Sequence, residues 1–156
     1  HATLAASIVL GIPALLLLSR NAIIHERLVD RLEAQEERKE VRRLNHDERF
    51  RQALPLLDRL LARDPDDVET LQTSALTRFR LAEIETDRQV RADLQMRALA
   101  DASQLVQLEP QASWPYRVRA FISRGFGRIA EAEQDERAAA ASTRSATPWS
   151  ALIATT

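Results

Sequence analysis

A stripe of alanine and leucine that ends in a proline limits what this chain can fold into. In residues 47–67 the apolar side chains follow one another in steps of three or four: Phe50, Ala53, Leu54, Leu57, Leu60 and Leu61. That spacing gives a helix one apolar face. Pro65 ends the helix, because proline lacks an N–H and disfavours helical geometry at the residue before it. A single helix of this length is unstable in water, so its apolar face requires a neighbouring helix.

The same spacing recurs further along the chain. Each copy ends in a proline 12 residues after its first alanine. The first copy contains Ala53, Leu57, Leu60, Arg63 and Pro65, and the second has Ala98, Ala102, Leu105, Leu108 and Pro110 at the same spacing. The ending and the helix–DPDD–helix order in LLARDPDDVETLQTSAL resemble the tetratricopeptide repeat (TPR) family, whose unit is a helix–turn–helix of about 34 residues. The resemblance covers roughly residues 34–142. It implies an all-α solenoid that binds other proteins.

Capping residues predict where the helices begin. Asp47 is placed to cap the helix of the first stretch, with Glu48 in its first turn. Asp66 or Asp67 is placed to cap the helix that follows the DPDD joint, which we predict from Val68 to about Glu85.

The second repeat is longer than the family unit. Pro65 and Pro110 are 45 residues apart, which leaves 11 residues beyond a 34-residue unit. The stretch RLAEIETDRQVRADLQM keeps a helix-forming composition. We therefore expect both helices of this repeat, over about 68–85 and 87–108, to be longer by about one and a half turns each.

The resemblance also divides the chain. It predicts a TPR-like domain over 34–146, with repeats at about 34–67, 68–112 and 113–146, and a capping segment or truncated repeat over 147–156. Repeat three matches the family pattern at Tyr116, Ala120, Gly127 and Ala132. The apolar face of its second helix is expected to consist of Ile129, Ala132 and Ala139. The departures from the pattern are Val41, Pro55, Arg119 and Glu136.

The N-terminal stretch 2–19, ATLAASIVLGIPALLLLS, carries no charge. A bilayer is spanned by ~17–25 apolar residues, so we expect a transmembrane helix over 1–20 and a helical stalk over 21–33. A cleaved signal peptide and a buried core helix are the alternatives. Ser7 and Gly11 form a small-xxx-small pair that would let a second membrane helix approach closely, although small residues are common in membrane helices anyway.

The composition argues against an enzyme and against metal or nucleic-acid binding. The chain has no cysteine, three glycines and a net charge of −1, so thiol catalysis, thiolate metal sites, phosphate-binding loops and nucleic-acid binding are not expected. The histidines, His1, His25 and His46, are scattered and lack partners at ligand spacing. We expect no enzyme activity, no metal and no cofactor.

The predicted binding surface comes from the family resemblance, in which the first helix of each repeat lines a concave face. The corresponding residues are basic or aromatic for the most part: Arg38, Arg42, His46, Gln72, Phe79, Arg80, Trp114, Arg117, Phe121 and Arg124. Arginine pairs well with carboxylates and aromatic rings act as anchors, so an acidic protein segment is a candidate ligand. The alternative is that these arginines lie on this face by chance, because arginine is abundant throughout the chain. The Lys/Asn clamp for a terminal carboxylate found in other TPR proteins is absent.

The sequence thus predicts a membrane-anchored TPR protein that scaffolds or assembles a membrane protein complex. A permanent accessory subunit of an energy-transducing or secretion complex is the first alternative, and a periplasmic TPR adaptor with a cleaved signal peptide is the second. The arginines after the apolar stretch favour a cytoplasmic location for the repeats, with the periplasmic side left open.

Overall fold

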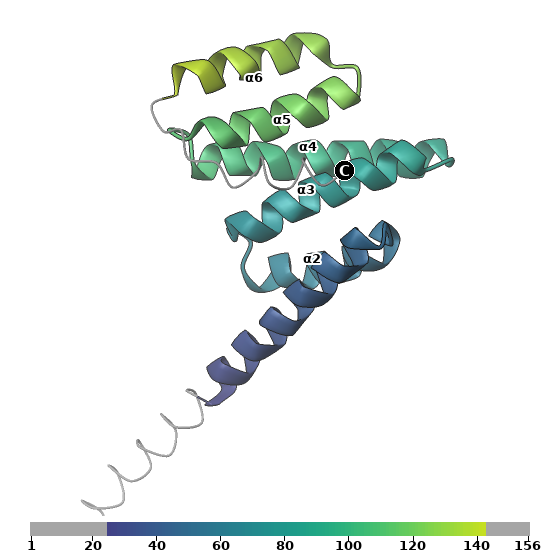
Figure 1. Ribbon diagram of the computed structural model, residues 1–156, viewed down its shortest axis with the longest axis vertical. Helices are drawn as coiled ribbons and strands as arrows, with labels where there is room; N and C mark the ends of the chain where they lie inside the picture. The colour runs from purple at the N-terminus through teal and green to yellow at the C-terminus, as the bar shows by residue number, and fades with distance from the viewer. Residues whose placement is uncertain (1–24, 143–156) are drawn as a thin grey trace, which may run out of the picture. The chain divides into compact units, whose positions relative to one another are not determined.

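A computed structural model describes residues 25–142, and its regular architecture consists of helices (Figure 1). Residues 25–46 are helical. They are followed by α2 (Phe50–Arg63), α3 (Val68–Ile84), α4 (Arg88–Leu108), α5 (Ser113–Gly125) and α6 (Ile129–Ala141). The prediction of an all-α chain is confirmed over this range. The predicted capping segment 147–156 lies outside it.

The chain forms two compact units, residues 1–39 and 40–156. In the first unit, the described residues 25–39 are helical and mostly exposed, with Leu28 at 56% and Leu32 at 57%. Between residues 25 and 142 no helix is long and apolar enough to cross a membrane. The predicted span 1–20, including Ser7 and Gly11, lies outside the described residues.

In the second unit the helices pack in chain order. The most extensive contacts join α3 to α4 and α5 to α6, and smaller ones join α2 to α3 and α4 to α5. Figure 1 shows α3, α4, α5 and α6 stacked one after another. This is helical repeat-like packing, in which each helix pair contacts mainly its neighbours.

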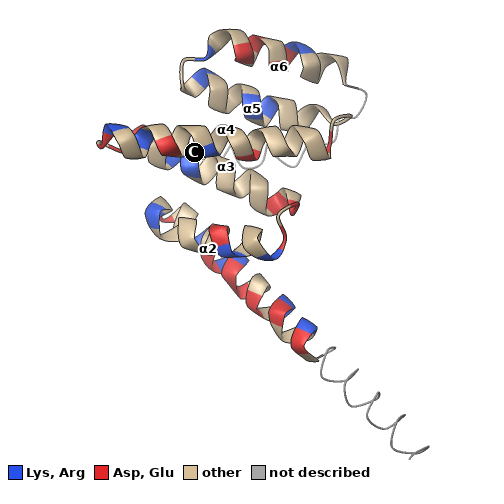
Figure 2. Ribbon diagram, turned by 180° about the vertical axis from the view of Figure 1, so that it is seen from behind, with Lys and Arg blue, Asp and Glu red and all other residues tan. Residues whose placement is uncertain are grey.

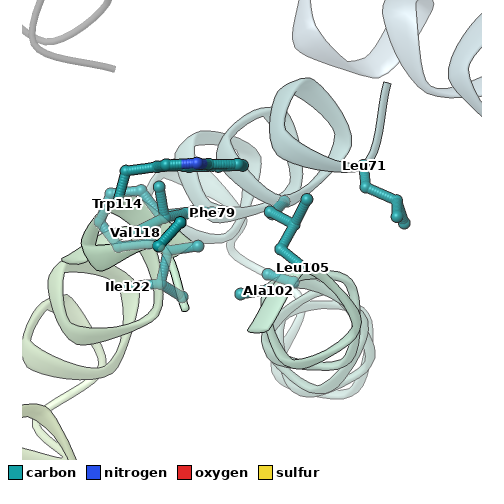
Figure 3. Packing of buried hydrophobic residues seen from close by; sticks show 10 residues of the cluster. Leu71, Phe79, Ala102, Leu105, Trp114, Val118 and Ile122 are labelled. Atoms are coloured by element: carbon teal, nitrogen blue, oxygen red, sulfur yellow. The ribbon is translucent and has the colours of Figure 1, made fainter. Parts of the chain in front are cut away.

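The main core lies where α3, α4 and α5 meet (Figure 3). Alanines permit close approach of the helices, and Ala75, Ala98 and Ala102 are fully buried. Large side chains fill the remaining space, namely Leu71, Phe79, Leu105, Trp114, Val118 and Ile122. The predicted apolar stripes of α2 and α4 are confirmed at Ala53, Leu57, Leu60, Ala98, Ala102 and Leu105, which are all less than 4% exposed, whereas Leu108 at the end of α4 is 37% exposed. Ile129 is a correction: it is 44% exposed, because it occupies the first turn of α6.

The start of α2 differs from the prediction. Asp47 does not cap α2, because its N–H donates to the carbonyl of Arg43 at 3.0 Å and so ends the preceding helix. The chain then turns at Glu48, whose φ is 56°, and α2 begins at Phe50 without a side-chain cap. The predicted cap at Asp67 is confirmed, since its carboxylate accepts a bond from the Thr70 N–H.

The insertion in repeat two is helical, as predicted, but it is shared unequally. α3 has 17 residues and α4 has 21, against 13 each in α5 and α6. The extension is therefore about one turn in α3 and about two turns in α4. Glu85 and Asp87 fix the turn between them: Glu85 accepts bonds from the Thr86 and Asp87 N–H groups, and Asp87 caps α4 through Gln89 and Val90.

Candidate functional site

The structure separates the predicted binding residues into three kinds. Arg38 belongs to the first unit. Arg42 and His46 are exposed in the short helical stretch 40–46, and Arg42 pairs with Glu69 of α3 at 3.5 Å. The other residues lie on α3 and α5, and the aromatic ones among them, Phe79, Trp114 and Phe121, come together where these two helices meet.

We call this line the α3–α5 seam and define it by Gln72, Phe79, Trp114, Arg117 and Phe121. The Phe79 and Phe121 rings pack edge to face, 5.2 Å between centroids. Phe79 also lies against Gly125 at the end of α5, and Figure 1 shows that α3 and α5 run in the same direction.

This register places the polar residues of the seam. Gln72 precedes Phe79 by seven residues, and Arg117 precedes Phe121 by four. Gln72 therefore lies about two turns before Phe79, and Arg117 about one turn before Phe121, each on approximately the same face of its helix as the phenylalanine. Gln72 and Arg117 therefore differ by only about 4.5 Å along the common helix direction.

Two of the three aromatic residues of the predicted surface, Phe79 and Trp114, are core residues. Phe79 is 2% exposed and Trp114 is 4% exposed, so neither presents an open anchor for a partner. Trp114 satisfies its indole N–H by donating to Glu109 Oε2 at 2.8 Å. A sequence signal for this existed: Leu71, Ala75 and Phe79 follow one another in steps of four, which places the phenylalanine on the same buried stripe as the leucine.

The cations along the seam differ in their pairing. Arg80 lies 5.8 Å from the centre of the Phe79 ring and pairs with Glu83 at 3.2 Å. Arg124 pairs with Glu136 of α6 at 2.6 Å. Arg117 is exposed and has no ion pair within residues 25–142.

The α5 helix contains no acidic residue, as Figure 2 shows, and this leaves its surface positive. Arg119, which departs from the family pattern, is neutralised by α6. Its guanidinium donates two bonds to the Asp135 carboxylate, at 2.7 and 2.8 Å, and the pairing raises the pKa of Arg119. Arg117 therefore supplies the unneutralised charge of this helix.

Gln72 is the unusual polar group of the seam. Its side chain is 6% exposed, and its amide nitrogen is buried without a hydrogen-bond partner. A buried donor without an acceptor costs about 1–3 kcal/mol of folding free energy.

A second feature, missed by the sequence reading, is a buried ion network centred on Arg78. Its guanidinium donates to Asp58 of α2, to Asp101 of α4 and to Ser74 of its own helix. Ser74 Oγ also donates to Asp101 at 2.7 Å. Burial raises the pKa of Asp101, while Arg78 and Ser74 oppose that shift. The network joins three helices and has a structural role.

Other candidate sites offer less support for a binding function. A cavity of about 210 Å³ lies where the start of α2 meets the end of α3, lined by Phe50, Leu81 and Ile84 with charged residues around them. It does not coincide with the predicted binding surface. In the part of the chain that the structure describes, no group of three or more histidine and acidic side chains could hold a metal ion.

Comparison with known proteins adds no relative: no protein-family model, no curated protein and no solved structure matches this chain. The TPR resemblance therefore stays a prediction, and the packing of the helices supports only a repeat-like all-α fold.

Proposed function

We propose that this protein is a non-enzymatic protein–protein interaction module of the TPR-like type, anchored in a membrane by residues 1–20. Its function is to scaffold or assemble a membrane protein complex. The observation that supports the proposal is the stacking of successive helix pairs in chain order, which brings α3 and α5 into contact with each other. Repeat architectures of this kind characteristically present such surfaces to other proteins.

The polar residues along that surface also support a binding role. Arg117 is an exposed cation with no ion pair in residues 25–142, and Gln72 carries a buried donor without an acceptor. Neither arrangement contributes stability to the isolated protein, whereas both can contribute to a complex.

The test is extraction of the tagged full chain from its membrane in mild detergent, followed by mass spectrometry of the proteins that co-purify. The matched control lacks residues 1–20 and keeps the same tag. We expect specific membrane proteins to co-purify with the full chain and to be reduced at least severalfold with the control. Recovery of the full chain in the soluble fraction, or the same proteins with an unrelated tagged membrane protein, would contradict the proposal.

The same experiment separates two forms of the function. One stoichiometric set of subunits that survives moderate salt indicates a permanent accessory subunit. Several substoichiometric partners that dissociate in salt indicate an adaptor, because polar interfaces of exposed charges are weakened by ionic screening.

A further inference from the structure

The α3–α5 seam has the features of a subsite for one negatively charged group. α5 carries three arginines and no acidic residue, and α6 neutralises two of them through Asp135 and Glu136. The third, Arg117, is exposed. A guanidinium in this position can form a bidentate pair with a carboxylate.

Gln72 supplies the second donor. Its amide nitrogen is buried without an acceptor, and counted from the Phe79–Phe121 contact the backbone of Gln72 lies only about 4.5 Å from the level of Arg117 along the helix direction. The nitrogen lies beneath the surface, so an incoming group reaches it only when the side chains above it shift. Exposed side chains change rotamer within nanoseconds.

We propose that the seam binds the carboxylate of an aspartate or glutamate in a partner protein, with Arg117 as its ion-pair partner and Gln72 Nε2 as a hydrogen-bond donor. This inference rests on the proposed protein-binding function and specifies the chemistry of the partner. A carboxylate is favoured over a neutral carbonyl because it matches the one cation of α5 that α6 leaves unneutralised.

The test is fluorescence anisotropy of the full chain in detergent micelles with three labelled peptides of equal length. One alternates glutamate and alanine, and the others carry glutamine or lysine in place of glutamate. A hydrogen bond to a charged group is worth roughly 10–100-fold in affinity, so we expect the glutamate peptide to bind at least about tenfold more tightly than the glutamine peptide.

Two variants and one control make the test specific. Arg117→Gln and Gln72→Leu should each reduce the preference for glutamate to within about threefold. Arg137→Gln removes an equal charge from α6, outside the seam, and should keep the preference. Gln72→Leu should leave the melting temperature unchanged or higher, because it removes an unsatisfied buried donor. Loss of binding without loss of stability then separates recognition from misfolding.

Several results would overturn the inference. Equal affinity for all three peptides would do so, as would a glutamate preference that survives Arg117→Gln. A dimer in sedimentation that dissociates in the Arg117→Gln protein would assign the seam to a second copy of this chain. In each case co-purification of membrane partners with the full chain would leave the broader function standing.

Discussion

Replacing Arg78 with methionine tests how the repeats are held together. The change removes a buried positive charge but keeps an unbranched side chain of similar length. The Arg78 side chain is 7% exposed, and that of its partner Asp101 is 14% exposed. Without the guanidinium, Asp101 keeps one polar contact, the 2.7 Å bond from Ser74. Breaking a buried pair from one side costs about 3–5 kcal/mol of unfolding free energy, and we expect a loss in that range at pH 7.

The other carboxylate of the network matters less. Asp58 is 54% exposed on α2, so water solvates it when Arg78 is removed. Asp58→Asn should therefore cost only about 0–1 kcal/mol, the range of surface ion pairs. Both carboxylates contact the same guanidinium, so the difference in stability loss between variants of Asp58 and Asp101 measures the effect of burial.

The pH dependence of the Arg78→Met protein follows from the pKa of Asp101. Burial already raises this pKa, and Arg78 opposes the shift, so removal of Arg78 raises the pKa further. A carboxyl with a raised pKa in the folded protein binds a proton more readily there than in the unfolded chain. Its cost is present at neutral pH and is relieved as the pH falls through the folded pKa towards the unfolded value. The variant should recover part of its stability in mild acid.

The assay is urea unfolding followed by far-UV circular dichroism for the parent, Arg78→Met, Asp101→Leu and the double variant. Removing both charges leaves no uncompensated carboxylate, so the double variant should be more stable than Arg78→Met by at least about 1–2 kcal/mol. A loss below about 1 kcal/mol for Arg78→Met, or strict additivity in the double variant, would refute the argument that burial makes this pair important.

Three further predictions concern backbone and caps. Gly125→Ala places a Cβ 2.4 Å from Phe79 Cε2 and should cost about 1–3 kcal/mol in urea unfolding, a loss that Phe79→Leu relieves. Gly127→Ala meets no atom within 4 Å but must adopt a φ of +76°, so it should cost about 1–2 kcal/mol that Phe79→Leu does not relieve. Backbone hydrogen bonds from Val90 and Gln89 lower the pKa of Asp87, so Asp87→Ala should lower the melting temperature at pH 7. The difference in melting temperature from the parent should shrink as the pH falls below 3.8, the ordinary pKa of aspartate. A difference that persists at pH 2 would contradict the assignment of this stability to the Asp87 cap.

The helices could be predicted from the sequence because periodicity and proline placement are local signals. The stripe of α2, the Asp67 cap and the helical insertion before Pro110 depend on residues a few positions apart. The start of α2 could not be predicted in the same way. It depends on where the preceding helix ends and on the positive φ of Glu48, which closes the turn between two packed helices.

The candidate site could be predicted only in outline. The family resemblance predicts residues of α3 and α5, and the aromatic ones among them do meet, but it does not distinguish a buried aromatic residue from an exposed one. Phe79 and Trp114 are in the core because three helices converge there, and that depends on contacts distant in sequence. The unsatisfied nitrogen of Gln72 is likewise a property of the packed structure, since no sequence pattern tells which donor finds an acceptor.

The Arg–Asp pairs show that the repeats share a contact that does not appear as identical residues at corresponding positions. Ala75 and Ala120 occupy corresponding places, so the pair Ser74 and Arg78 in α3 corresponds to Arg119 and Ser123 in α5. Serine and arginine have exchanged places, one helical turn apart.

Each arginine nevertheless reaches an aspartate on the second helix of its own repeat. These aspartates, Asp101 and Asp135, are 34 residues apart, as are Ala98 and Ala132. Each arginine also contacts a polar side chain of the helix before, Asp58 for Arg78 and Ser103 for Arg119. Since a long arginine side chain can span one turn, the feature that recurs is a buried carboxylate satisfied from the neighbouring helix. The position of the arginine that satisfies it does not recur. Identical residues at fixed spacing therefore make Arg119 a departure from the repeat pattern, whereas in the packed helices Arg119 makes the same kind of contact as Arg78.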